Sequence, residues 1–239
     1  MMLKALLFDV FGTIVDWRGS IVDEGAAWGR VKGLEIDWGD FADRWRAGYQ
    51  PAMAKVRRGE LPWTKLDDLH RVILAEVLEE FDIRGLTEAE KDDWTRVWHR
   101  LRPWPDAVPG LARLRQRYTI APLSNGNVAL LTDMAKRAGL PWDVILSAEL
   151  ARHYKPDREC YLTAVELLSL QPDDVMMVAA HVPDLEAARR VGLRTGFIYR
   201  PLEYGPGRAA DRAAAGQFDV VADDVIALDR ALASRGADR

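Results

Sequence analysis

The sequence is almost without cysteine. Cys160 is the one cysteine among 239 residues, so no disulfide can form within the chain and a zinc site built from several cysteines is excluded. We interpret Cys160 as a buried, inert thiol rather than a nucleophile. The scarcity of cysteine agrees with a reducing compartment, and we expect a cytoplasmic protein.

The chain also lacks a strong charge of one sign and any long apolar run. Its 33 Lys and Arg residues against 37 Asp and Glu residues give a net charge of −4, which argues against nucleic-acid binding. No apolar run approaches the roughly 18 residues of a membrane span, and the first residues lack the cleavage site of a signal peptide. The motifs of P-loop ATPases and of zincin proteases are absent as well. We therefore expect a soluble protein that binds neither nucleic acid nor a membrane.

Strand signals alternate with helix signals over most of the chain. A short apolar run predicts a buried strand over residues 3–9. After Pro103 and Pro105, the pattern predicts strands over 119–123, 144–147, 174–179, 194–198 and 219–221, and helices over 107–117, 128–138, 158–169, 184–191 and 224–234. This alternation predicts an α/β fold with a parallel, Rossmann-like sheet.

A helical block interrupts this alternation. Helices are predicted near residues 20–33, 40–58, 64–81 and 88–100, and eight of the nine tryptophans fall between positions 17 and 104. We interpret these tryptophans as core or pocket wall of a separate subdomain. The sequence therefore predicts a core domain of residues 1–16 and 103–239, and a helical cap of residues 17–102 over the carboxyl ends of the strands, where such sheets bind ligands.

Polar residues follow four of the predicted strands, at the point where each strand ends. They are Asp9 with Gly12 and Thr13, then Ser124-Asn125-Gly126, then Lys155-Pro156-Asp157, and finally Asp184. A carboxylate at a strand end can act as a covalent nucleophile, and a lysine offers a point charge beside it. Taken singly, each group is also explained as a turn or a helix cap. Together, on one edge of one parallel sheet, they predict a catalytic site.

In this order, four motifs resemble those of the haloacid dehalogenase superfamily, and most closely those of its L-2-haloacid dehalogenase (type II) branch. They are Asp-x-Phe-Gly-Thr at 9–13, Ser-Asn-Gly at 124–126, Tyr-Lys-Pro-Asp at 154–157 and the segment 178–184. The resemblance covers essentially the whole chain. It implies an enzyme without a cofactor or metal that hydrolyses short 2-haloalkanoic acids, namely haloacetates and L-2-haloacids, to 2-hydroxy acids through an ester on Asp9. Its ligands are then the 2-haloacid and the halide ion, and a homodimer is common in the branch.

Two positions separate this branch from the phosphatases of the same superfamily. The phosphatases carry a second aspartate where this chain has Phe11, and a metal-binding acid where it has Ala180. Because Mg²⁺ needs oxygen ligands, both replacements disfavour metal-dependent phosphoryl transfer. Phe11 instead offers an apolar wall to a carbon–halogen bond. A phosphatase, or a member without catalysis that binds a small acid or a protein partner, stays the alternative.

The resemblance also implies a role for individual residues. Arg46, in the pair Trp45-Arg46, corresponds to the arginine that faces the leaving halide, with Arg44 as the alternative register. Thr13 and Ser124 correspond to hydroxyl residues near the nucleophile and the substrate carboxylate, and Asn125 to an asparagine that helps to hold the halide. Lys155 corresponds to the lysine that orients the nucleophile, and Tyr161 to the tyrosine six positions after that lysine. Asp184 corresponds to the aspartate near the hydrolytic water.

The chain departs from the branch in the segment before Asp184. Ala179-Ala180-His181 stands where many members have Ser-Ser-Asn, and Pro183 where they often have tryptophan. Since histidine donates hydrogen bonds and titrates near neutral pH, we expect a pocket role for His181, including help to a poor leaving group such as fluoride. We expect Trp63 in the pocket wall and a narrow pocket that favours haloacetates. His70, His99 and His153 are interpreted as surface or structural residues.

Overall fold

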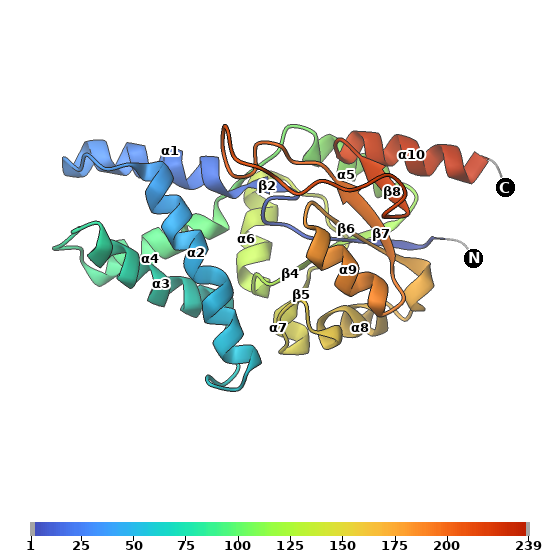
Figure 1. The fold of residues 1–239 in the computed structure, drawn as a ribbon, viewed down its shortest axis with the longest axis horizontal. Coiled ribbons are helices and arrows are strands. Elements are labelled where there is room, and N and C mark those ends of the chain that lie inside the picture. The colour runs from blue at the N-terminus through green and yellow to red at the C-terminus, as the bar shows by residue number, and fades with distance from the viewer. Residues whose placement is uncertain (1–2, 238–239) are drawn as a thin grey trace.

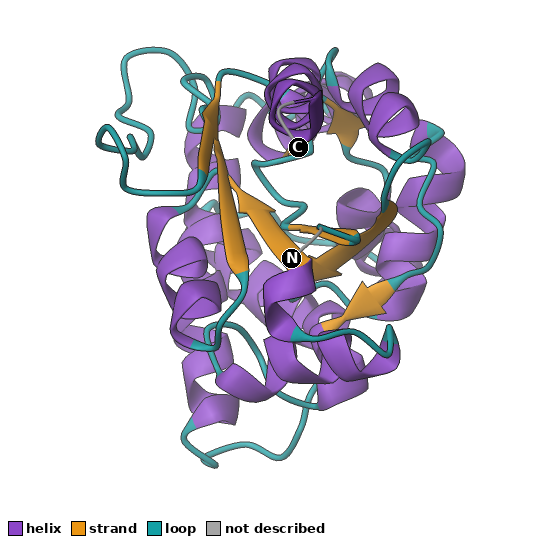
Figure 2. Cartoon of the chain, turned by 90° about the vertical axis from the view of Figure 1, so that its right-hand side faces the viewer, coloured by secondary structure: helices purple, strands orange, loops and turns teal. Residues whose placement is uncertain are grey.

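The computed structural model describes residues 3–237 and is built around one six-stranded parallel sheet (Figures 1 and 2). The strand order is β5-β4-β1-β6-β7-β8, and every pairing is parallel. The strands are β1 (Ala5–Phe8), β4 (Thr119–Ser124), β5 (Leu146–Ser147), β6 (Val175–Ala179), β7 (Arg194–Ile198) and β8 (Val220–Ala222). The predicted α/β fold with a Rossmann-like sheet is confirmed.

Helices cover both faces of the sheet, which explains why its central strands are apolar throughout. Helices α5 (Ala107–Leu114) and α10 (Val225–Ala237) pack together on one face, and α8 (Arg158–Leu167) and α9 (Val182–Arg190) lie on the other (Figure 1). All residues of β1 and β6 are buried, as expected for strands with helices on both sides. Three shorter or flanking elements complete this part of the chain: α6 (Val128–Ala138), α7 (Ala148–Ala151) and the 3₁₀ helix η2 (Pro172–Asp174).

A second group of helices stands beside the sheet, at the left of Figure 1. Its members are α1 (Trp17–Lys32), α2 (Trp38–Arg57), α3 (Leu66–Glu80), α4 (Glu88–Thr95) and the 3₁₀ helix η1 (Arg96–His99). Two expectations for this region were wrong in detail. The helix expected near 20–33 begins at Trp17, because the side chain of Asp16 accepts the N–H of Gly19 and so caps the helix. The helix expected over 88–100 changes to 3₁₀ geometry at Arg96.

A short antiparallel ribbon joins the two parts of the chain. Strand β2 (Val15–Asp16) leads into α1, and β3 (Arg102–Pro103) leads back toward the sheet, with Val15 opposite Pro103 and Asp16 opposite Arg102. Strands of two residues are too short to show an alternating pattern, so neither was predicted. Because both crossings lie side by side in this ribbon, the chain passes between the helical group and the core at a single place.

Tryptophan packing holds the helical group together. The rings of Trp38 and Trp94 stack with centroids 5.7 Å apart, and Trp28 meets both of them edge-on. Helix α1 makes room for Trp38 with Gly25, where a Cβ atom would lie 2.3 Å from the indole. These contacts account for the concentration of tryptophan in this part of the sequence.

The histidines outside the site have structural surroundings. His99 bridges Asp67 of α3 and Asp133 of α6, with nitrogen–oxygen distances of 3.0 and 2.8 Å, and so ties the helical group to the core. His70 is fully buried and stacks on Trp98 at 4.2 Å; burial lowers its pKa to about 3, which keeps it neutral. The His153 side chain is half exposed. Within residues 3–237, no helix has the length and apolar character that a membrane crossing requires.

Candidate active site

A cavity of ≈690 Å³ opens between the carboxyl ends of the strands and the helical group. Residues from both parts of the chain line it. From the sheet side they include Asp9, Phe11, Asn125, Lys155, Tyr161, His181 and Asp184, and from the helical group they include Arg46, Tyr49 and Gln50. A loop after β7, residues 199–219, adds Tyr204 and Asp211. The structure thus brings most of the predicted site residues together.

Asp9 lies where β1 ends, and the turn after it fixes its carboxylate. The backbone N–H of Asp9 donates to Val178, and Gly12 continues the turn with a φ of 85°, which favours glycine. Thr13 Oγ1 donates to Asp9 Oδ2 at 2.8 Å and accepts the N–H of Ala180 at 2.9 Å. The predicted contact between Thr13 and Asp9 is therefore present, and Oδ2 is held while Oδ1 faces the lysine.

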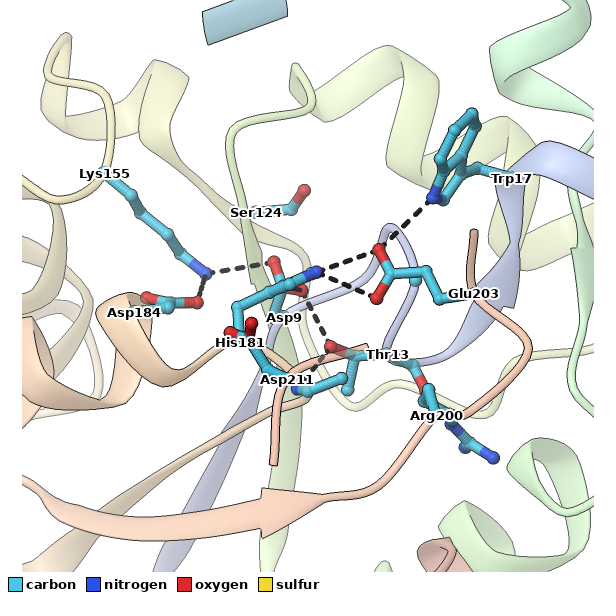
Figure 3. A network of polar contacts seen from close by, with 12 residues as sticks. Asp9, Thr13, Trp17, Ser124, Lys155, His181, Asp184, Arg200, Glu203 and Asp211 are labelled. Atoms are coloured by element: carbon cyan, nitrogen blue, oxygen red, sulfur yellow. Dashed lines mark hydrogen bonds and ion pairs between the residues drawn. The ribbon is translucent and has the colours of Figure 1, made fainter. Parts of the chain in front are cut away.

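Two cations flank the Asp9 carboxylate, and each has a second carboxylate behind it (Figure 3). Lys155 Nζ lies 3.4 Å from Asp9 Oδ1 and 2.8 Å from Asp184 Oδ2. On the other side, His181 Nδ1 lies 3.1 Å from Asp9 Oδ2, and its Nε2 lies 2.9 Å from Glu203 Oε1. Asp9 is therefore one of three carboxylates bridged by two cations.

These neighbours decide the protonation of the nucleophile candidate. Burial alone would raise the pKa of Asp9, but the charge of Lys155 and the contacts with His181 and Thr13 outweigh it and hold this pKa far below its usual range. Burial would likewise lower the pKa of Lys155, and the charges of Asp184 and Asp9 raise it instead. At neutral pH the site holds a carboxylate and an ammonium ion.

The side chains of Asn125 and Tyr161 orient Lys155 and Asp184. The side-chain oxygen of Asn125 accepts the backbone N–H of Lys155 at 2.8 Å, and Tyr161 donates its hydroxyl to Asp184 Oδ1 at 2.6 Å. Asn125 itself is carried by the turn that follows β4. Ser124, the last residue of β4, is fully buried, and its hydroxyl accepts the N–H of Gly126 in that turn. Ser124 thus stabilises the turn that presents Asn125.

Arg46 reaches the cavity from α2. Its guanidinium lies over the rings of Tyr49 and Trp17, 4.1 and 5.5 Å from their centroids, and its buried Nη1 has no hydrogen-bond partner among residues 3–237. Buried polar atoms are nearly always paired, so the unpaired donor indicates a place for an anion. Arg44, the alternative register, is exposed and pairs with Asp40 and Glu80.

The structure differs from two of the expected contacts. Trp63 does not line the cavity but packs on Tyr154, with ring centroids 4.7 Å apart; Tyr49 supplies the aromatic wall instead. His181 lines the cavity, yet both of its ring nitrogens already face carboxylates. It is therefore placed to act on Asp9 rather than to donate to a leaving halide.

Three residues of the site, Tyr49, Glu203 and Asp211, were not predicted from the sequence. Tyr49 lies three positions after Arg46, a spacing that places both on one helical face, and this signal was available. Glu203 and Asp211 lie in a loop of irregular composition, where nothing distinguishes them from surface acids. Glu203 is nevertheless only 2% exposed.

The donor set does not suit a divalent metal. Lys155 Nζ occupies the space between Asp9 and Asp184, and Phe11 and Ala180 supply no oxygen side chain. No group of three or more His, Cys, Asp and Glu side chains in the described part of the chain is arranged to hold a metal ion.

Comparison with known proteins agrees with this geometry. A family model described as haloacid dehalogenase-like hydrolase matches residues 3–192. The (S)-2-haloacid dehalogenase 4A of Burkholderia cepacia is 29% identical over 224 residues, which cover 84% of this chain and 87% of that protein. The crystal structure of an L-2-haloacid dehalogenase is 50% identical, covers 97% of this chain and 99% of its own, and superposes with a TM-score of 0.93. The crystal structure of a defluorinating L-2-haloacid dehalogenase is 48% identical in sequence and superposes with a TM-score of 0.94. The match covers 97% of this chain and 95% of that protein chain.

Proposed function

Because the chain belongs to the haloacid dehalogenase-like hydrolases, and within them to the L-2-haloacid dehalogenases, we propose that it hydrolyses short 2-haloalkanoic acids to 2-hydroxy acids through an ester on Asp9. The observation that carries this proposal is the ionised Asp9 carboxylate, which faces a cavity also lined by Arg46, whose buried Nη1 has no partner among residues 3–237. A nucleophile and an anion site in one cavity fit a substrate that is itself an anion and releases a second one.

In the first step Asp9 attacks C2 of the substrate. Thr13 and His181 both engage Oδ2, whereas Lys155 lies at 3.4 Å from Oδ1, so Oδ1 is the freer oxygen and the nucleophile. The Oδ1–C2 bond forms as the carbon–halogen bond breaks, and the bonding pair leaves with the halide. Attack from the side opposite the halide inverts C2. Arg46 and Asn125 hold the departing halide, whose developing charge their donors stabilise.

In the second step water attacks the ester at Cγ of Asp9. The water oxygen becomes part of the regenerated carboxylate, and the original Oδ1 leaves as the hydroxyl of the product. Asp184, fixed by Lys155 and Tyr161, positions this water. Because C2 is not attacked again, the inverted configuration is retained in the product.

The corner of the cavity around Asp9 favours small substrates. The cavity as a whole exceeds the size of a haloacetate, but Phe11 and Tyr49 meet edge-to-face at 6.5 Å beside the nucleophile. We propose haloacetates as better substrates than longer 2-haloacids, with fluoroacetate among them. The relative at 48% identity is named as defluorinating, and the Arg46 and Asn125 donors are the groups that a departing fluoride needs.

Location and assembly are part of the same proposal. Cys160 is buried, and burial raises the pKa of its thiol to about 12, so the thiol is unreactive at neutral pH. This agrees with our interpretation of Cys160 as inert, and the cytoplasm remains our proposed location.

A homodimer is the proposed assembly, and light scattering of the purified protein tests it.

Halide release in metal-free buffer tests the proposed reaction. The wild-type protein is expected to release halide from chloroacetate, fluoroacetate and 2-chloropropionate, and the Asp9→Asn variant from none of them, because an amide does not attack carbon. Faster turnover of 2-chloropropionate than of chloroacetate would overturn the substrate-size argument alone. No halide from any of the three would overturn the dehalogenase proposal itself.

A further inference from the structure

The loop after β7 delivers a buried carboxylate to the back of the active site. Glu203 is 2% exposed, and its oxygens lie 2.9 and 3.1 Å from His181 Nε2. Trp17 Nε1 donates to the same carboxylate at 3.3 Å. Gly12 leaves the space that the carboxylate fills, since a Cβ atom there would lie 2.1 Å from Glu203 Oε1. Two separate parts of the chain, residues 12–17 and His181, therefore surround this one side chain.

The geometry also sets the protonation of His181. Its Nδ1 faces Asp9 Oδ2 and its Nε2 faces Glu203. A neutral imidazole carries one N–H and could donate to one of these acceptors only. With both carboxyl groups ionised, each oxygen facing the ring needs an N–H donor, so both nitrogens carry protons and His181 is an imidazolium ion between two carboxylates.

We propose that Glu203 is a positioning residue that keeps His181 a charged hydrogen-bond donor to Asp9 Oδ2, so that His181 and Thr13 form the oxyanion hole for hydrolysis of the Asp9 ester. This inference rests on the function proposed above and assigns a part in its second step to a residue outside the family's motifs.

Negative charge develops on Oδ2 during the second step, and two donors at this atom stabilise it. Once Oδ1 is bonded to the substrate, Oδ2 is the ester carbonyl oxygen, still beside Thr13 Oγ1 and His181 Nδ1. Addition of water to Cγ moves the carbonyl electron pair onto Oδ2. Collapse restores the carbonyl and breaks the Cγ–Oδ1 bond; one proton of the water ends on the leaving oxygen, and the other is released to solvent as Asp9 becomes a carboxylate again. Donors aimed at Oδ2 stabilise the charge that develops there.

Glu203 matters most after the ester has formed. Esterification removes the negative charge of Asp9, one of the two carboxylates that favour the imidazolium form, and Glu203 is then the carboxylate left in contact with it. An asparagine in place of His181 would be a donor without any such partner. The Glu203 carboxylate is therefore needed because this chain has histidine, and not asparagine, at position 181.

The other charged and titratable groups near His181 do not replace Glu203. Lys155 lies across Asp9 and is itself a cation, and Asp211 accepts the backbone N–H of Val182. Burial, reinforced by Glu203, raises the pKa of Tyr204 and keeps it neutral. Burial would lower the pKa of His181, but its hydrogen bonds to Asp9 and Glu203 raise it to about 10. His181 thus stays charged through neutral pH, and loss of Glu203 moves its titration down.

The Glu203→Gln variant tests the proposal, because it keeps the shape of the side chain and removes its charge. With chloroacetate, we expect a burst of about one equivalent of halide followed by slow turnover, with both kcat and KM lowered, since the ester accumulates. Near pH 9 kcat should fall about tenfold, the difference between a charged and a neutral donor, and recover toward pH 6. Intact-mass spectrometry should detect the carboxymethyl ester on Asp9. A kcat that falls equally at all pH values, without a burst, would overturn the proposal.

The His181→Asn background supplies the matched control. An asparagine donor needs no charge behind it, so Glu203→Gln should have little further effect on kcat in that background. An equal loss in both backgrounds contradicts the proposal. NMR of the labelled imidazole gives a readout that does not depend on turnover: His181 should remain doubly protonated from about pH 6 to about pH 9 in the free wild-type protein and titrate within that range in Glu203→Gln. Absence of this shift overturns the role of Glu203, whereas absence of any halide release overturns the dehalogenase proposal.

Discussion

The guanidinium of Arg46 lies 4.1 Å from the centre of the Tyr49 ring and leaves its buried Nη1 without a hydrogen-bond partner among residues 3–237. A ring face attracts a cation but does not replace a hydrogen-bond acceptor. A guanidinium held in this way is ready for an anion, and both the carboxylate of the substrate and the departing halide are anions.

This relationship predicts a large effect of Arg46→Gln on catalysis. We expect kcat/KM for chloroacetate to fall by about a hundredfold or more, because a donor to developing charge is lost, with little loss of thermal stability. Arg44→Gln is the matched control, since Arg44 lies on the same helix, is exposed and pairs only with surface acids. Equal activity of the two variants would contradict the assignment of Arg46.

The lysine between two carboxylates leads to a prediction about metals. Lys155 Nζ contacts both Asp9 and Asp184, and these are the carboxylates that a divalent ion at this edge of the sheet would need. We therefore expect halide release to continue in excess chelator at an unchanged rate. Activity that disappears with chelator and returns with Mg²⁺ would favour the phosphatase type of site, and hydrolysis of a phosphate ester would then be the next measurement.

The bridge through His99 predicts how stability depends on pH. Burial would lower the pKa of His99, but Asp67 and Asp133 outweigh it, and this pKa is raised. A raised folded-state pKa stabilises the protein below the unfolded value of about 6.5, and this contribution disappears as pH rises through the folded value. His99→Gln should therefore lower the free energy of unfolding by about 1 kcal/mol near pH 6 and by less near pH 9.

Urea unfolding at several pH values measures this difference. His153→Gln is the control, because the His153 side chain is half exposed and lies 3.7 Å from Asp157. His70, whose folded-state pKa is lowered to about 3, reduces stability below its unfolded pKa of about 6.5, but it does so equally in wild type and His99→Gln and cancels in the difference. A constant difference between wild type and His99→Gln across the pH range would show that the bridge acts through packing rather than charge.

The parallel sheet and the residues at its edge were predictable from the sequence for a physical reason. Asp9 and Asn125 directly follow apolar strands, so a parallel sheet places them at the same edge. Lys155 and Asp184 also come from the connections that leave this edge, Lys155 after the short helix α7 and Asp184 in the first turn of α9. The boundaries were less predictable. The start of α1 depends on one cap by Asp16, and the ribbon of β2 and β3 contains too few residues to show an alternating pattern.

The parts of the site that were missed depend on tertiary packing. Glu203 becomes a buried partner of His181 because Gly12 leaves space for it and Trp17 donates a hydrogen bond to it. Both of these residues are far from Glu203 in the chain. Trp63 was expected in the pocket because it stands near the position of an aromatic residue in the cap of the family, yet it packs on Tyr154 outside the cavity lining. A residue type predicts burial, whereas the direction in which a side chain points is decided by its neighbours in the fold.

The central claim is that Asp9, and not water, attacks the substrate carbon. A single turnover in ¹⁸O-water, with the enzyme in excess over chloroacetate, tests it most directly. We expect a glycolate hydroxyl without ¹⁸O, because its oxygen comes from Asp9, and one ¹⁸O atom in the peptide that contains Asp9. Label in the glycolate of the first turnover and none in that peptide would contradict it.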